Sequence, residues 1–132
     1  QLQVISTMAR DLSFRVKVVG CPTLRHSDGL ALSSRNAYLN PEERNGATAL
    51  SRSLQVASEN VRAGETSASV IKSQIVDEIT AEPLVALDYV EIVEGSSLLT
   101  IDKITEGARI LIAAKIGKAR LIDNVDPYFG IK

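Results

Sequence analysis

The first twenty residues carry two hydrophobic patterns in succession. Apolar side chains recur at the spacing of one helix face, which predicts a helix over residues 2–13. Residues 15–19 then alternate polar and β-branched side chains, which predicts a strand that ends at Gly20 and Pro22. A helix followed by such a strand is typical of the closing unit of an α/β sheet. The predicted helix face consists of Leu2, Ile5, Ala9 and Leu12.

Residues 20–40 follow this strand and show neither helical nor strand periodicity. Connections without secondary structure that exceed about 12–15 residues are uncommon and usually functional. In open α/β sheets, ligands bind beyond the carboxyl ends of the strands. The segment is therefore the first place to look for chemistry.

Two helices joined by a tight turn are predicted next. Asn40 is a good N-cap, Pro41 suits the first helical position, and Glu43 completes a capping box. Gly64 supplies the C-terminal stop. The second helix begins at Thr66 or Ser67 and ends at Pro83, and the short connection predicts antiparallel packing of the pair. The apolar faces are formed by Ala47, Leu50, Leu54, Ala57 and Val61, and by Ala68, Ile71, Ile75 and Ile79.

Alternating patterns predict three strands in the last third of the chain. The strand over 109–116 has the clearest pattern, with apolar side chains at every even position, and Gly117-Lys118 forms a turn after it. The other predicted segments are strands over 88–93 and 119–123, a loop or short helical turn over 95–107, and an irregular tail over 126–130.

The chain has 132 residues, enough for one domain or for a small domain with a piece of another. Its net charge of −1 gives no electrostatic footprint for nucleic acid or an anionic membrane. Binding of a small anionic ligand is still compatible with this charge, because it needs only one or two well-placed cations. Cys21 is the single cysteine, which excludes an internal disulfide and fits a reducing cytoplasm. No apolar run reaches the ~18–20 residues of a transmembrane helix. Because Gln1 opens a helical pattern without a cap, we expect the chain to be a fragment of a longer protein.

The sequence Ser33-Ser34-Arg35-Asn36 is the main candidate for chemistry. A guanidinium pairs with phosphate in bidentate fashion, and neighbouring hydroxyl and N–H groups can complete a phosphate cradle. A solvated loop with a surface arginine is the alternative from residue types alone.

The other polar candidates favour structural interpretations. His26 is the only histidine, and a lone loop histidine is usually solvated rather than a general base. We expect the Cys21 thiol to be packed and inert, because no base stands beside it. The acidic side chains of Asp88, Glu91 and Glu94 favour a solvated sheet face over a metal site. The cations are expected to be surface and edge-strand charges, and they are Arg109, Lys115, Lys118 and Arg120.

The run from Asp28 to Leu39, Asp-Gly-Leu-Ala-Leu-Ser-Ser-Arg-Asn-Ala-Tyr-Leu, closely resembles the signature of the pantoate–β-alanine ligase (pantothenate synthetase) family. The preceding residues 18–25, the helix start at Asn40-Pro41 and the sequence Leu-Ile-Asp-Asn over 121–124 also resemble that family. The resemblance extends collinearly over essentially the whole chain. It favours the phosphate interpretation of Ser33–Arg35 over the solvated loop.

The resemblance implies an α+β chain, with a helical pair packed on a short antiparallel sheet after the last helix–strand unit of a Rossmann-like domain. It implies three parts: the end of a truncated nucleotide-binding domain (1–20), an ATP-phosphate loop and hinge (21–40), and a C-terminal lid domain (41–132). The family belongs to the nucleotidyltransferase superfamily. It condenses pantoate with β-alanine at the expense of Mg²⁺-ATP, through a pantoyl adenylate, and releases AMP and pyrophosphate. Its intact members tend to be homodimers.

The resemblance also implies individual roles. Leu32, Ser33, Ser34 and Arg35 match the loop that contacts the ATP phosphates, with Arg35 as the catalytic cation. Leu24 matches a position near the adenine, and Gln1 matches a glutamine that holds pantoate. Cys21 stands where the family more often has valine, which is a packing change.

The family's His-x-Gly-His motif and most of its pantoate-binding stretch are absent from this sequence. We therefore expect the chain alone to be inactive, and residues 1–20 to lack their sheet partners. Two alternatives stay open: a non-catalytic interaction domain, and a related nucleotidyltransferase with another acid substrate.

Overall fold

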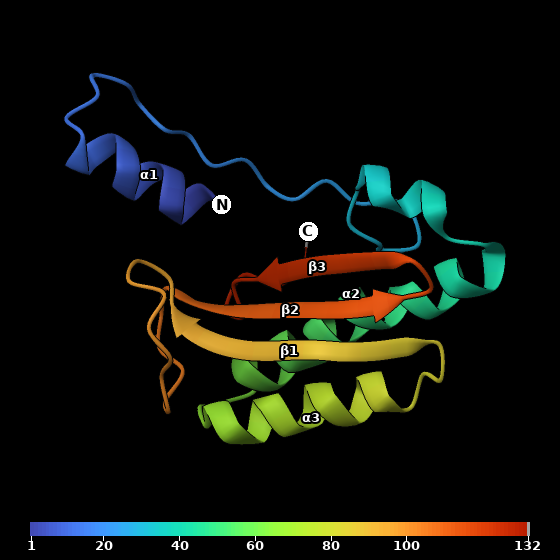
Figure 1. Ribbon diagram of the computed structural model, residues 1–132. Coiled ribbons are helices and arrows are strands. Elements are labelled where there is room, and N and C mark those ends of the chain that lie inside the picture. Colours follow the sequence, from blue (N-terminus) through green and yellow to red (C-terminus); the bar gives the residue numbers. More distant parts are fainter. Residues whose placement is uncertain (132) are drawn as a thin grey trace.

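The strands predicted near the end of the chain form one antiparallel sheet in the computed structural model, which describes residues 1–131 (Figure 1). The order is β1-β2-β3, with β1 over Val85–Glu94, β2 over Ala108–Ile116 and β3 over Ala119–Val125. All three predicted strands are confirmed, although β1 begins three residues earlier than expected and β3 ends two residues later. The even positions of β2 are buried as their alternation predicts, namely Ile110, Ile112, Ala114 and Ile116.

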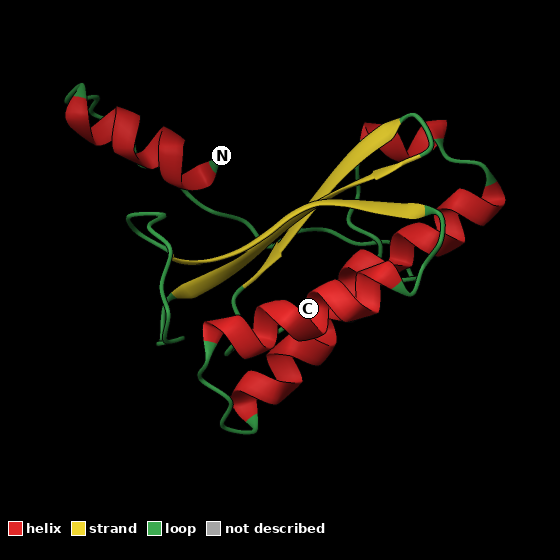
Figure 2. Ribbon diagram, turned by 60° about the horizontal axis from the view of Figure 1, so that its bottom comes forward, coloured by secondary structure: helices red, strands yellow, loops and turns green. Residues whose placement is uncertain are grey.

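Two helices cover one face of this sheet, α2 over Pro41–Arg62 and α3 over Ala68–Thr80 (Figure 2). They pack against each other, α3 also packs on β1, and α2 contacts all three strands. This arrangement confirms the predicted α+β class and the helical pair. In the described part of the chain, no helix is long and apolar enough to cross a lipid bilayer. The helical side chains at the centre of the core are Ala47, Leu50, Leu54, Ile71, Ile75 and Ile79.

The predicted helix ends are also confirmed. The Asn40 side chain accepts the Glu43 N–H at 2.8 Å, and the Glu43 carboxylate accepts the Asn40 N–H at 2.9 Å. These reciprocal bonds satisfy two backbone donors that the first turn would otherwise leave unpaired. Gly64, at a φ of +112°, follows the end of α2, and the Ser67 side chain caps α3.

The connection over residues 95–107 is a loop without a helix, so the loop alternative of the prediction is the correct one. Ser96 and Ser97 donate hydrogen bonds to the Glu94 carboxylate and lower its pKa to about 2. Asp88 pairs with Arg120 and Glu91 pairs with Lys72. Each of the three acidic side chains of β1 thus has a separate partner.

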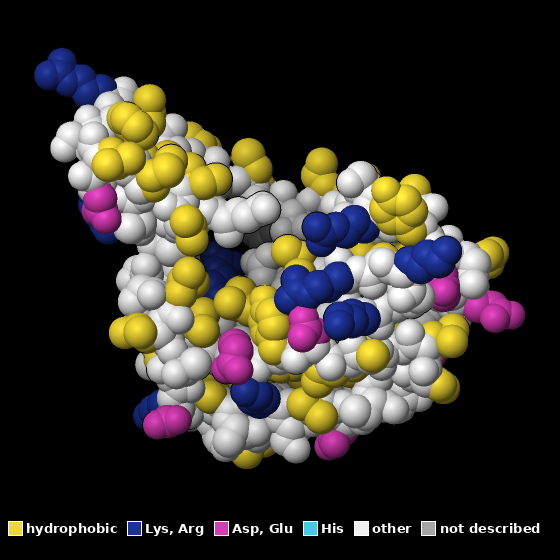
Figure 3. Space-filling view, viewed as in Figure 1, with side chains coloured by type: hydrophobic (Ala, Val, Ile, Leu, Met, Phe, Trp, Pro, Cys, Tyr) yellow, Lys and Arg dark blue, Asp and Glu magenta, His cyan; other side chains and the backbone are white. Residues whose placement is uncertain are grey.

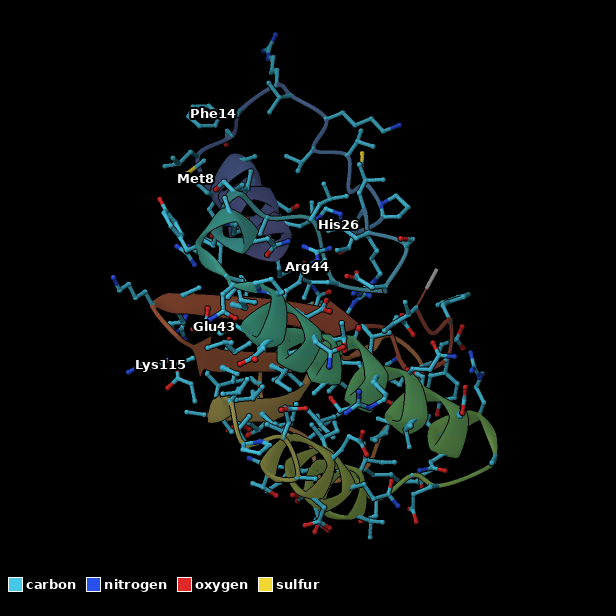
Figure 4. The ribbon with its side chains drawn as sticks, turned by 90° about the vertical axis from the view of Figure 1, so that its right-hand side faces the viewer. Met8, Phe14, His26, Glu43, Arg44 and Lys115 are labelled. Carbon is cyan, nitrogen blue, oxygen red and sulfur yellow. The ribbon has the colours of Figure 1, made fainter. Side chains whose placement is uncertain are left out.

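The first twenty-four residues lie outside the body formed by the sheet with α2 and α3, and Gln3 Nε2 donates to the Ser96 carbonyl of the loop after β1. The predicted helix is confirmed as α1 (Leu2–Asp11), but the predicted strand over 15–19 is wrong. A strand needs a neighbour for its N–H and C=O groups. Within the described residues, the N–H groups of 15–23 make no hydrogen bond, and Val16 and Val19 are each 65% exposed. Figure 4 shows Met8 and Phe14 pointing away from the rest of the molecule.

The expectation of a packed Cys21 is also wrong, because the thiol is exposed. Its segment is the extended chain between α1 and the body (Figure 1), and its neighbours Gly20 and Pro22 are exposed as well.

A buried ion pair attaches the long loop to the sheet. Arg25 donates to Asp123 of β3 in bidentate fashion, with Nη1–Oδ2 and Nη2–Oδ1 distances of 2.6 and 2.9 Å. The two side chains are only 8% and 3% exposed. Arg25 Nη1 also donates to the Gly29 carbonyl at 3.1 Å. Desolvating two charges is costly, and this fork geometry with its additional bond offsets that cost.

We expect residues 14–23 to be the least protected part of this chain in amide hydrogen exchange. From Arg15 onward their N–H groups make no hydrogen bond to a described residue, so exchange needs little opening, whereas the amides of α2 and β2 require loss of the core. Mass-spectrometric exchange on the monomer measures both in one experiment. Protection of residues 1–20 equal to that of 41–123 would contradict the described conformation.

Removing one member of the buried pair should destabilise the fold strongly. Arg25→Met should lower the free energy of unfolding by about 3–5 kcal/mol, because the Asp123 carboxylate then stays buried without a cation, with only the Asn124 N–H bonded to it. The double variant Arg25→Met with Asp123→Leu should recover much of this loss, since no buried charge remains.

Urea unfolding measures the two single variants, Arg25→Met and Asp123→Leu, and the double variant. Arg10→Met is the matched control, because Arg10 pairs with the exposed Asp11 and should change stability by less than about 1 kcal/mol. A double variant as unstable as the sum of the two single variants would argue that the pair is not energetically coupled.

Candidate functional site

A cleft of about 420 Å³ opens along the free edge of β3. One wall is the loop after Arg25, a second is β3 itself, and Gln1 at the start of α1 reaches it from the other side. Figure 3 shows a hollow between the α1 region and the main body. Three segments that are far apart in sequence therefore meet here. The lining includes Leu32, Ser33, Ser34, Arg35, Asn36, Asp123 and Asn124.

The first part of the loop is a small hairpin. Arg25 and Ala31 form an isolated bridge, and the turn between them uses Gly29 at a φ of +86°, a conformation that glycine adopts without strain. Asp28 accepts the Leu30 N–H at 3.1 Å and pairs with Arg44 of α2 at 2.8 Å.

The charge state of Asp28 follows from these contacts. Partial desolvation alone would raise the pKa of Asp28, but the Leu30 N–H and Arg44 together bring it below its ordinary value. The carboxylate therefore stays charged at neutral pH and ties the hairpin to the first turn of α2.

The second part of the loop places the predicted phosphate ligands. Ser33 caps a short 3₁₀ helix, η1 (Ser34–Tyr38), and its hydroxyl accepts the Arg35 N–H at 3.2 Å. The Arg35 guanidinium donates through Nη1 to the main-chain carbonyl of Arg120 at 3.0 Å. This bond uses one of the five N–H donors and fixes the guanidinium beside β3. Its Nε and Nη2 groups bond to none of the described residues, so they can serve an anion.

The structure brings together five of the six predicted site residues. Gln1 and the four residues Leu32–Arg35 line the cleft, and Leu24 does not. The Leu24 side chain is 73% exposed, while its carbonyl accepts the Leu32 N–H at 2.8 Å. Leu24 thus lies next to the site through its backbone. The ligand contacts of all six residues remain predictions.

Sequence reasoning gave no site role to four polar residues of this lining, namely Thr23, Arg120, Asp123 and Asn124, whereas Asn36 belongs to the predicted cluster 33–36. Asp123 occupies an inward position of β3 between Leu121 and Val125, and a carboxylate on an apolar face is a signal that a cation must reach it. Asn36 is buried and donates to the Ala31 carbonyl at 3.0 Å, while its Oδ1 has no partner within the described part of the chain. Arg120 lines the cleft although its charge was interpreted as an edge-strand feature.

His26 lies in the hairpin turn, near Arg44 at the start of α2 (Figure 4). Its backbone N–H donates to the Leu30 carbonyl, and its carbonyl accepts the Gly29 N–H. The residue is outside the cleft lining. Among the described residues, no group of His, Cys, Asp and Glu side chains is arranged to hold a metal ion.

Three comparisons with known proteins match this architecture. The model of the family described as "Pantoate-beta-alanine ligase" matches residues 1–126. Pantothenate synthetases from Clostridium acetobutylicum and Pelotomaculum thermopropionicum are 49% and 50% identical over 124 residues, which are 94% of this chain and 44% of each relative. The chain thus spans less than half the length of these relatives.

Two solved structures give the same result. The crystal structure of pantothenate synthetase from Thermus thermophilus superposes with a TM-score of 0.91 at 42% identity, over 96% of this chain and 46% of that one. A Francisella tularensis pantoate–β-alanine ligase, complexed with β,γ-ATP and β-alanine, gives a TM-score of 0.58 at 25% identity, over 96% and 40% of the two chains.

The family model covers nearly the whole chain, several relatives approach half identity, and the fold matches a solved member along its length. This chain belongs to the pantoate–β-alanine ligase family.

Proposed function

We propose that this chain supplies part of the ATP site of an enzyme that condenses pantoate with β-alanine. The observation that carries the proposal is the cleft lined by Ser33, Ser34 and Arg35 on one side and Gln1 on another. The Francisella relative was crystallised with β,γ-ATP and β-alanine, which supports these classes of substrate. The observed cleft is open, as a partial site would be.

The reaction proceeds in two steps under this proposal. A carboxylate oxygen of pantoate attacks the α-phosphorus of ATP, the bond to the β-phosphate breaks, and pyrophosphate leaves with its electron pair. The amine of β-alanine then attacks the acyl carbon, loses a proton, and displaces AMP as the amide bond forms. Both steps require the alignment of groups that repel each other or react slowly in water.

Arg35 and the two serines act on the phosphates in this scheme. The free N–H groups of Arg35 stabilise the negative charge that develops on the α-phosphate and on the departing pyrophosphate. The hydroxyls of Ser33 and Ser34 add hydrogen-bond donors on the same loop. Because the Arg120 carbonyl and the Ser33 cap already orient Arg35, little reorganisation is needed when the ligand arrives.

Gln1, which lines the other side of the cleft, binds the acid substrate in this proposal. Its amide can donate to a pantoate oxygen and accept from a hydroxyl, which orients the attacking carboxylate. Magnesium enters as part of the substrate. Asp123 is the one carboxylate in the lining formed by the described residues and is committed to Arg25, so phosphate oxygens and water would supply the ligands of Mg²⁺.

The proposal also assigns a role to each of three segments of the chain. Residues 1–20 are the end of a nucleotide-binding domain, residues 21–40 are the phosphate loop and hinge, and residues 41–132 form a lid. The exposed apolar side chains of α1 and the extended segment support this division, because a second structural layer would cover them. The intact enzyme is a cytoplasmic homodimer in this proposal, and the chain alone does not turn over.

AMP formation tests the proposal directly. We expect AMP from ATP, pantoate and β-alanine when this chain is mixed with a separately produced amino-terminal half of the enzyme, and none from either part alone. Product in the absence of either acid would contradict the ligase assignment. An inactive uninterrupted parent enzyme would favour a non-catalytic interaction domain.

The role of Arg35 has its own measurement. In the active assembly, Arg35→Ala should lower the rate of pyrophosphate release by about 10²–10³, the loss typical of one transition-state donor. Arg52→Ala is the matched control, because Arg52 pairs with Glu78 on α3 outside the cleft. An unchanged rate in the Arg35 variant would remove its phosphate role.

A further inference from the structure

A second arginine belongs to the same cleft. Arg120 is the second residue of β3, lines the cleft, and accepts the Arg35 guanidinium on its carbonyl. Its neighbours Ala119 and Leu121 are buried, so the alternation of the strand directs Arg120 to the outer face of the sheet. The tight turn at Gly117-Lys118 precedes it directly. The backbone that carries this side chain is therefore among the most firmly held of the cleft.

A β-bulge determines how the Arg120 side chain is oriented. The β1–β2 register shifts between Leu87 and Tyr89, and Asp88 lies in this irregularity. Bulges re-aim side chains, and here the Asp88 carboxylate reaches across β2 to accept from Arg120 Nε at 2.7 Å. The guanidinium also lies 5.9 Å from the centroid of the Tyr89 ring. Both contacts leave Nη1 and Nη2 without a hydrogen bond to any described residue.

The Asp88–Arg120 pair can be shared with a ligand. Its side chains are 36% and 45% exposed, and an ion pair in such a setting contributes little net stability. An anion that carries several charges can bind the two free Nη groups without breaking the Nε contact, since a guanidinium presents donors on two sides.

The surroundings favour an anion. Figure 3 shows Lys and Arg side chains gathered over this end of the sheet, with one acidic side chain among them. Arg35, Lys115, Lys118 and Arg120 are the exposed cations here. Lys115 points away from the loop into solvent (Figure 4), and neither lysine lines the cleft. Arg35 and Arg120 are thus the two cations in the cleft lining formed by the described residues; Arg120 meets Arg35 there through its carbonyl, and its guanidinium lies over the outer face of the sheet beside Asp88 and Tyr89.

We propose that Arg120 is a second phosphate-binding residue, which together with Arg35 holds the polyphosphate tail of the nucleotide, and that Asp88 is its resident counter-ion. The inference rests on the proposed ATP site. Two guanidinium groups, one on a loop and one on a strand, suit a chain of linked phosphates, which is long enough to contact both. A single phosphate would gain less from the second arginine.

Binding to this chain tests the inference without turnover. Titration calorimetry would use ATP, inorganic tripolyphosphate and adenosine as probes at fixed low salt. Arg120→Gln should weaken ATP and tripolyphosphate about tenfold, the usual effect of one charge-assisted hydrogen bond, and leave adenosine unchanged. Lys118→Gln is the matched control, since it removes a neighbouring cation that lies outside the cleft.

Asp88→Asn should have the opposite effect on phosphate binding. It keeps the side-chain shape and removes the competing charge, so tripolyphosphate should bind a few-fold more tightly. This gain should vanish in Asp88→Asn combined with Arg120→Gln if it acts through Arg120. Circular dichroism and a urea midpoint near that of the parent chain establish that each variant is folded.

The outcomes separate the inference from the proposed function. Loss of binding in Arg35→Gln with unchanged binding in Arg120→Gln would overturn the inference and leave the phosphate loop in place. Equal losses in Lys118→Gln and Arg120→Gln would also overturn it, by showing general attraction only. If the parent chain binds neither ATP nor tripolyphosphate, the phosphate site assigned to this chain fails, and the inference fails with it.

Discussion

The buried pair between Arg25 and Asp123 is the contact on which the site depends. It joins a loop residue to a strand residue 98 positions away, and it is the reason that a carboxylate can occupy the inward face of β3. The fork leaves no freedom for the hairpin over 25–31 to slide along the strand, because two parallel hydrogen bonds fix both position and orientation. Residues 32–35 follow this hairpin directly, so their place beside β3 is determined by it.

The anchored loop carries a local cost of its own. Oδ1 of Asn36 is buried without a partner among the described residues, and such an acceptor is unfavourable relative to water. The same side chain bonds the Ala31 carbonyl through its amide, and the Asp28–Arg44 pair adds a second tie to α2. Local costs of this type persist where the surrounding structure over-determines a conformation, which is common at functional sites.

The sequence predicted best the parts that short-range physics controls. The capping box of Asn40 and Glu43, the helix faces and the alternation of β2 each depend on neighbours within a few residues, and each is confirmed. The strand over 15–19 failed because its pattern describes side chains, whereas a strand also needs hydrogen-bonding neighbours. Its alternation was still informative, since Val16 and Val19 are exposed here and suit a covered sheet. The pairing of Arg25 with Asp123 and the position of Arg120 in the cleft lining depend on contacts between residues far apart in the chain, which no local pattern encodes.

The two arginines of the cleft differ in how firmly their backbones are held, and this difference bears on how the site can work. Arg120 sits on a paired strand over the core, whereas Arg35 sits on a short 3₁₀ turn at the end of a loop. The bond from Arg35 Nη1 to the Arg120 carbonyl couples the cation on the loop to the strand that carries the second one. A ligand bound to both arginines would therefore hold the loop in a fixed position relative to the sheet. Under the proposed function, this coupling would let the loop and the sheet close on the nucleotide as one body, without a separate ordering step for the loop.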